Sequence, residues 1–133
     1  MPTQFLSPTG LAPTNGWTQV VTSTGGKTIY VSGQVSVDER GQVVGKGDLK
    51  AQTEQTFANL AVALKAAGAS LRDVVKMNLY VVGLKPELVP LIREVRARYV
   101  DREHPPASTL VGVSALVGAD WLIEIEVVAV LAE

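Results

Sequence analysis

The sequence predicts an α+β domain with one mixed sheet and two helices on one face of that sheet. Two patterns carry this prediction. Several segments alternate apolar and polar residues with a period of two, which is typical of strands. Two longer segments instead place apolar residues at helical spacing. The elements follow the order β-β-α-β-α-β-β, and two right-handed crossovers in one sheet place both helices on the same face.

The chain of 133 residues has the size of one domain, so we expect residues 1–133 to form a single unit. Residues 1–16 are rich in Pro, Thr and Gly, and we expect them to form an irregular N-terminal arm. A short strand over 17–23 then leads through a glycine turn at 24–27 into the strand with the cleanest alternation, 28–37.

Two helices and three further strands follow. Asp48 is a suitable N-cap for a helix that runs to Ala67, and Gly68 supplies its stop. A second helix begins near Pro86 and carries one apolar stripe. Its charged residues lie off that stripe and are expected to form a solvated face: Arg93, Glu94, Arg96 and Arg98. The remaining strands are predicted over 74–82, 108–117 and 121–131.

Charge and composition argue against several classes of function. Lys and Arg number 12 against 13 Asp and Glu, a formal net charge of −1, and no basic stripe suggests a nucleic-acid partner. There is no cysteine, and His104 is the single histidine, so we predict no metal site. No apolar run reaches the roughly 20 residues of a membrane span, and the N-terminus lacks the pattern of a secretory signal. We therefore expect a cytoplasmic protein without a membrane partner.

The final strand predicts a sheet face that the two helices leave uncovered. Its even-numbered residues include Leu122, Val128 and Val130, and neither face of the strand over 108–117 carries a charge. A monomer that exposes so much apolar sheet would be prone to aggregate. We therefore predict that the protein associates with itself through the sheet, as a closed ring whose copy number these residues leave open.

Two carboxylates interrupt this apolar face. Glu124 and Glu126 are two residues apart on the final strand, so both project from one face, about 7 Å apart. One interpretation makes them a proton-donating or water-activating pair in a subunit interface. The alternative is that they pair with Lys or Arg, or reach solvent.

Ser32 and Gly33 lie inside the strand with the cleanest alternation. Glycine in a strand interior often marks the close approach of a ligand or of another backbone. The serine hydroxyl and the adjacent backbone N–H would then anchor a carbonyl or carboxylate oxygen. The alternative is a bulge with a solvent-facing serine.

Three motifs, taken in order, resemble the Rid family of reactive intermediate deaminases, also called YjgF-like or L-PSP-type proteins. They are VSGQVSV, AGASLRDVVKMNLYV and LIEIEVVAVL, and the resemblance extends from Trp17 to Leu131. It implies a chorismate-mutase-like fold and a homotrimer with a central barrel, outer helices and small-molecule clefts between subunits. It also implies hydrolysis of enamine and imine intermediates to a 2-oxo acid and ammonia, without a cofactor.

The family's site residues carry over in part. The resemblance implies that Glu124 is the catalytic glutamate that positions or activates water. Ser32 and Gly33 match the family's Ser-Gly pair, which binds substrate. Trp17 stands where the family commonly has a tyrosine, and Ile92 stands where some members present an asparagine from the second helix. Both of these positions are expected to contact substrate.

The largest departure from the family lies at Ser108. Deaminating members carry the motif P-A-R-S at the start of the fourth strand, which is predicted over 108–117 here. The arginine of that motif binds the substrate carboxylate, and its position is occupied by Ser108 in this chain. We expect an altered substrate class, unless another arginine such as Arg96 takes its place. A non-catalytic ligand-binding, chaperone or regulatory trimer is the alternative. Ribonuclease activity is disfavoured because the chain has no histidine pair and no basic stripe.

Overall fold

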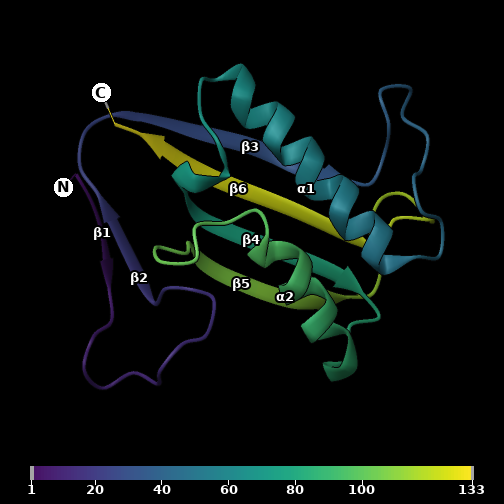
Figure 1. Ribbon diagram of the computed structural model, residues 1–133. Coiled ribbons are helices and arrows are strands. Elements are labelled where there is room, and N and C mark those ends of the chain that lie inside the picture. The colour runs from purple at the N-terminus through teal and green to yellow at the C-terminus, as the bar shows by residue number, and fades with distance from the viewer. Residues whose placement is uncertain (1, 133) are drawn as a thin grey trace.

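The computed structural model describes residues 2–132 and contains a mixed four-stranded sheet with both helices on one face (Figure 1). The strands lie in the order β3-β6-β4-β5. β6 pairs antiparallel with β3 and with β4, whereas β5 runs parallel to β4. The elements of these two layers are β3 (Lys27–Val35), α1 (Leu49–Ala66), β4 (Val74–Val82), α2 (Val89–Ala97), β5 (Ala107–Val113) and β6 (Ile123–Leu131). The predicted α+β class with a mixed sheet and two helices is confirmed.

Helix α1 begins and ends where its sequence predicts. The Asp48 side chain accepts a hydrogen bond of 3.0 Å from a backbone N–H of the first turn, and Gly68, at φ +80°, follows the last turn. Three large apolar side chains on its inner face are fully buried in the core: Phe57, Leu60 and Leu64. Neither α1 nor any other helix within residues 2–132 is long and apolar enough to cross a bilayer.

Helix α2 departs from the sequence prediction at one charged residue. A short 3₁₀ helix, η2 (Pro86–Leu88), leads into it, as Pro86 suggested. Ile92 and Val95 are fully buried, in agreement with the apolar stripe. Arg96 is only 5% exposed, so the expectation of a solvated face is wrong at this position. The reason is helical phase, since a residue four positions after Ile92 lies on the same side of the helix.

Strand β6 separates the two faces of the sheet. Its odd-numbered residues from Ile123 to Ala129 are at most 2% exposed and pack beneath the helices. The even-numbered residues, which include Glu124 and Glu126, are only half-buried on the opposite face. No helix of the described chain covers that face, which we call the open face (Figure 1).

The N-terminal segment is more regular than the sequence suggested. Strand β1 (Thr3–Leu6) pairs antiparallel with β2 (Val20–Ser23), so residues 1–16 are not irregular throughout. These two strands form a separate small sheet beside the main one (Figure 1). The first predicted strand therefore begins at Val20 and lies outside the mixed sheet. Pairing between residues that are 14 to 20 positions apart is a long-range contact, which local periodicity does not reveal.

The connection between β5 and β6 is longer than predicted. The expected strand over 108–117 ends at Val113, and the strand expected from 121 begins at Ile123. Within this loop Val117 is 95% exposed, so its apolar character marks no strand interior. The Trp121 ring packs closely over Gly118, where an added Cβ would lie 2.6 Å from ring atom Cδ2. The Trp121 side chain therefore packs within this loop, and Trp121 is not part of β6.

Candidate functional site

On the open face, Glu124 packs directly against Gly33. The pairing of β3 with β6 shifts between Val31 and Gln34, which places Gly33 within a bulge. A Cβ atom on Gly33 would lie 2.8 Å from Glu124 Cδ and would overlap the carboxylate oxygen. The carboxylate therefore occupies the space that any larger residue at position 33 would need. The bulge interpretation is therefore confirmed, and the group that approaches Gly33 closely is the Glu124 side chain. Anchoring of a ligand oxygen at this glycine stays a prediction.

Ser32 precedes this contact and is exposed on the same bulge. Its carbonyl oxygen accepts a hydrogen bond from Gln34 Nε2 at 3.1 Å, while its hydroxyl has no partner among residues 2–132. Two hollows of about 280 and 300 Å³ lie on the open face, one beside Ser32 and the other beside Glu124. Glu126 lines both of them. Ser32, Gly33 and Glu124 thus lie together on the open face.

The two carboxylates of β6 have different surroundings. The hydroxyl of Tyr80 donates a hydrogen bond to Glu126 Oε1, and Asn78 Nδ2 donates a weaker one at 3.4 Å. The hydrogen bond to Glu126 raises the pKa of Tyr80 above its usual 10.0, with smaller contributions from burial and from the charges of Glu126 and Glu124. Glu124 accepts no hydrogen bond from the described residues. Among the described residues, Glu126 is therefore the hydrogen-bonded carboxylate of the pair, and Glu124 is the one without a hydrogen-bond donor.

Tyr80 and Asn78 were not singled out from the sequence, although they alternate with buried residues on β4. The residues on their open side, Lys76, Asn78 and Tyr80, are polar and spaced by two. That period is a usable indication of a polar sheet face. The hydrogen bonds to Glu126 depend on β4 being the neighbour of β6, which the sequence pattern does not state.

Ser108 lies on the other side of the sheet. In the parallel pairing of β4 and β5 it is opposite Met77, whose side chain is fully buried beneath the helices. Paired residues on neighbouring strands project to the same face, so Ser108 points to the helix side and Glu124 to the open face. Within one chain, the serine at the family's arginine position and the catalytic candidate do not share a cavity.

Trp17 belongs with Ser108 rather than with Glu124. The neighbouring Thr18 is buried, and its backbone N–H donates to the carbonyl oxygen of Pro106 at 3.1 Å, which fixes this segment beside the start of β5. Trp17 itself is half-buried. The predicted site residues therefore divide into a group on the open face and a group at the edge of the helix side.

Ile92 joins neither group. Its side chain has no exposed surface and packs within the hydrophobic core. A residue without accessible surface in the protomer cannot contact a small molecule there, so the expectation that Ile92 binds substrate finds no support in its position. The helical phase that buries Arg96 also buries Ile92.

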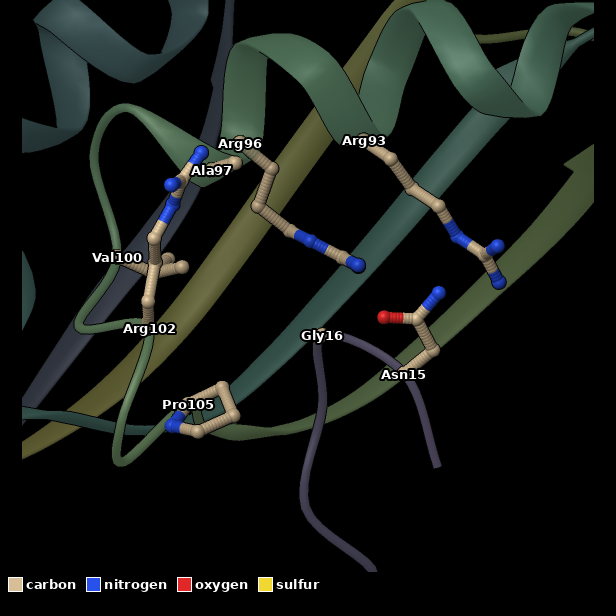
Figure 2. Close-up of a pocket in the computed structure, with 8 residues that line it drawn as sticks. All are labelled: Asn15, Gly16, Arg93, Arg96, Ala97, Val100, Arg102 and Pro105. Atoms are coloured by element: carbon tan, nitrogen blue, oxygen red, sulfur yellow. The ribbon is translucent and has the colours of Figure 1, made fainter. Parts of the chain in front are cut away.

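A third cavity lies near the Trp17 segment and holds several basic side chains (Figure 2). It has a volume of about 330 Å³ and is bounded by α2, the connector after it and the loop at Asn15 and Gly16. Arg96 points from α2 toward Gly16, and an added Cβ on Gly16 would lie 3.1 Å from Arg96 Nη2. Ser108 does not line this cavity. Arg96 is thus a cation in a cavity of its own.

Comparisons with known proteins agree with the geometry. The family model described as endoribonuclease L-PSP matches residues 8–131. The 3-aminoacrylate deaminase RutC of Acinetobacter baylyi is 35% identical over 129 residues, which are 97% of this chain and 98% of that protein. A 2-iminobutanoate/2-iminopropanoate deaminase of Dermatophagoides farinae is 30% identical over 126 residues, covering 95% and 91% of the two chains.

A solved structure shows the same fold. YyfB, a protein of the Rid family from Yersinia pestis, matches with a TM-score of 0.89 at 37% identity, and the match covers 98% of this chain and 100% of that one. The sequence motifs, the family model and the fold all agree over nearly the full length. The chain therefore belongs to the Rid family of YjgF-like, L-PSP-type proteins.

Proposed function

We propose that this protein is a homotrimer that hydrolyses a small imine or enamine in clefts between its subunits. The observation that carries the proposal is the free carboxylate of Glu124, held against Gly33 and near the exposed Ser32 on an uncovered sheet face. Two relatives that cover nearly the whole chain are named as deaminases of an enamine and of imines, which supports the same chemistry here.

Self-association is supported by the division of the site residues between two faces. Glu124 and Gly33 project from the open face, whereas Ser108 and the Trp17 segment lie at the edge of the helix side. One copy cannot bring both groups to a single small molecule. A cleft shared by two copies would, and a closed ring of three would also cover the half-buried apolar residues of the open face.

The proposed reaction is the addition of water across a carbon–nitrogen double bond. An enamine first takes a proton on carbon and loses one from nitrogen, which gives the imine. Water then adds to the imine carbon while Glu124 accepts one of its protons. The same carboxyl group returns this proton to nitrogen, which gives a carbinolamine. Glu124 then takes the proton of the new hydroxyl and passes it to nitrogen, the carbon–nitrogen bond breaks, and ammonia leaves as the carbonyl forms. One imine and one water thus give one carbonyl compound and one ammonia, and Glu124 ends in its starting form.

Ser108 sets the class of substrate in this proposal. A serine hydroxyl offers one neutral donor, whereas an arginine offers a charged, two-pronged contact to a carboxylate. Loss of such a contact in a cleft costs about 2–5 kcal/mol of binding. This corresponds to roughly 30-fold to several thousand-fold in affinity. We therefore expect neutral or weakly polar imines to be better substrates than 2-imino acids.

The test is a trapping assay with the purified full chain. Imino acids are generated by an amino-acid oxidase and neutral imines by an amine oxidase, and the imine that survives is trapped with semicarbazide. We expect faster loss of neutral imine than of imino acid. Glu124→Gln should lower this rate by about 10²–10⁴-fold, because the proton acceptor is lost. Glu39→Gln, a matched change in an exposed turn, should keep the wild-type rate.

Wild-type turnover by Glu124→Gln would contradict the catalytic role of this carboxylate. No acceleration over buffer by the wild-type chain with either class of imine would contradict the enzyme proposal as a whole. Light scattering tests the trimer separately. A particle with the mass of one chain would contradict the proposal of a cleft shared between subunits.

A non-catalytic ligand-binding, chaperone or regulatory trimer is the second candidate. The neutral Ser108 favours it, because this position is where deaminating members hold the substrate carboxylate. In that case small metabolites would raise the melting temperature and occupy the clefts in soaked crystals, with no product formed. Turnover of any bound metabolite would exclude this candidate.

A further inference from the structure

Arg96 is a nearly buried cation without a counter-ion. Its side chain is 5% exposed, and within residues 2–132 its guanidinium takes part in no ion pair and no hydrogen bond. Arg98, two positions later on the same helix turn, instead contacts Glu54 at 2.6 Å. Burying a charge that lacks a partner is costly, so proteins normally pair such groups. Among the described residues, Thr56 Oγ1 is the one fully buried side-chain polar atom without a hydrogen bond. The Arg96 nitrogens therefore reach the cavity that they line, where an anion from outside the described chain can pair with them.

The cavity around Arg96 has the shape of a binding site. The guanidinium extends from α2 toward Gly16, while Asn15, from the same loop, faces Arg93 (Figure 2). Gly16 adopts φ +83°, which favours glycine, and its lack of a Cβ leaves the 3.1 Å approach to Arg96 Nη2 open. The volume of about 330 Å³ lies within the range of small-molecule pockets.

The charge of this cavity has one sign. Arg93 and Arg102 line it together with Arg96, and among the described residues no acidic side chain does so. Burial lowers the pKa of the Arg96 guanidinium below its usual range, and the neighbouring charge of Arg93 lowers it further. Both effects disfavour the charged form of this side chain. An anion placed there would relieve both of them.

We propose that Arg93, Arg96 and Arg102 form a site for a small dianionic metabolite, a phosphate monoester or a dicarboxylate. Guanidinium groups bind both kinds of oxyanion through paired, charge-assisted hydrogen bonds. A monoanion would balance only one of the three positive charges, and so a dianion fits better. This site lies on the helix side of the sheet and involves no residue of the open face, but it adjoins the Trp17 segment, which the proposed cleft also uses. Its test measures anion binding and not turnover, so its failure is distinguishable from a failure of the imine hydrolysis proposed above.

The test measures binding of defined anions by isothermal titration calorimetry of the full chain. Inorganic phosphate, malonate and acetate are titrated separately at constant ionic strength set with chloride. We expect saturable binding of phosphate or malonate at one site per chain. The Kd should be at least about tenfold lower than that of acetate, because a dianion makes one more ionic contact and about 1.4 kcal/mol corresponds to a factor of ten in Kd. Tighter phosphate binding would assign the site to phosphate esters, and tighter malonate binding would assign it to dicarboxylates.

Variants locate the binding. Arg96→Met should weaken it at least about tenfold, and Arg96→Lys should give an intermediate loss because lysine keeps the charge but not the fork. Arg40→Met makes the same charge change in an exposed turn and should bind as the wild type does. If the Arg96 variants fail to fold, Arg93→Met replaces them, because it changes an exposed side chain of the same cavity. It should also weaken binding of the dianion.

Three results would overturn the proposal. The first is the absence of saturable binding of either dianion by the wild-type chain. The second is equal affinity for the dianion in wild-type and Arg96→Met chains, or, if that variant does not fold, in wild-type and Arg93→Met chains. The third is acetate binding as tight as that of the dianions, which would refute the charge argument.

Discussion

The open face and the arginine cavity lie on opposite sides of one sheet, and each contains a charged side chain that has no partner among the described residues. On β6, Glu126 is hydrogen-bonded by Tyr80 while Glu124 has no such partner. At the end of α2, the C-cap residue Arg98 is paired with Glu54, while Arg96 has no ion pair within residues 2–132. In both cases the two like residues are separated by two positions.

The cause of the difference is not the same in the two regions. Two positions along a strand return a side chain to the same face, so Glu124 and Glu126 differ only in their neighbours on β3 and β4. Two positions along a helix turn a side chain by about 200°, so Arg98 reaches solvent while Arg96 points inward. The carboxylates are distinguished by contacts, and the arginines by direction.

The largest expected effect tests the contact between Gly33 and Glu124. Gly33→Ala should destabilise the chain by about 1–3 kcal/mol, because its Cβ would overlap the carboxylate. In a Glu124→Ala background, the same glycine change should cost little, since the overlapping group is gone. Urea unfolding at one fixed protein concentration measures all four members of this cycle. An equal cost in both backgrounds would show that backbone strain, and not this contact, excludes alanine.

A smaller effect tests the partner of Glu126. Tyr80→Phe removes the hydroxyl donor and should cost about 1 kcal/mol at neutral pH. The pKa of Tyr80 is raised by its hydrogen bond to Glu126, so the folded chain keeps this proton above pH 10.0 while the unfolded chain loses it. The stabilising contribution is therefore complete below pH 10.0 and is lost as the pH rises through the folded pKa.

The control for this prediction is Tyr30→Phe, on the 80% exposed tyrosine of β3. Chemical unfolding between pH 8 and 11 should show a steeper alkaline decline for the wild type and for Tyr30→Phe than for Tyr80→Phe. The same alkaline decline in all three chains would mean that Tyr80 does not hold its proton more tightly when folded.

Local periodicity was sufficient to predict which side of a strand or helix most residues occupy. The alternation on β6 separated the buried residues from Glu124 and Glu126, and the caps at Asp48 and Gly68 gave the limits of α1. The Ser32–Gly33 interruption also marked the bulge correctly. These features depend on residues that are close along the chain, so the sequence contains them directly.

The remaining features depend on contacts between distant segments. The environment of Arg96 requires the loop at Gly16 to pack against α2, and the partner of Glu126 requires β4 beside β6. Neither arrangement follows from spacing. The helical period does predict that Ile92 and Arg96 lie on the same, inward side of α2. Because Arg96 is charged, however, its residue type alone predicts that it faces solvent.

The smallest expected effect compares Arg96 of α2 with its C-cap residue Arg98, in a buffer without phosphate or carboxylate. Arg98→Met should lower the melting temperature slightly at low salt, and this loss should vanish near 1 M NaCl, where the screening length falls to about 3 Å. Arg96→Met should leave the melting temperature unchanged or raise it, because it removes a buried charge that has no partner. A larger loss from Arg96→Met than from Arg98→Met would show that Arg96 is already satisfied within the chain. Arg96 would then stabilise the packing around α2 and would not be available to bind an anion. The arginine cavity would differ from the open face in the sign of its charge, but it would not be a binding site.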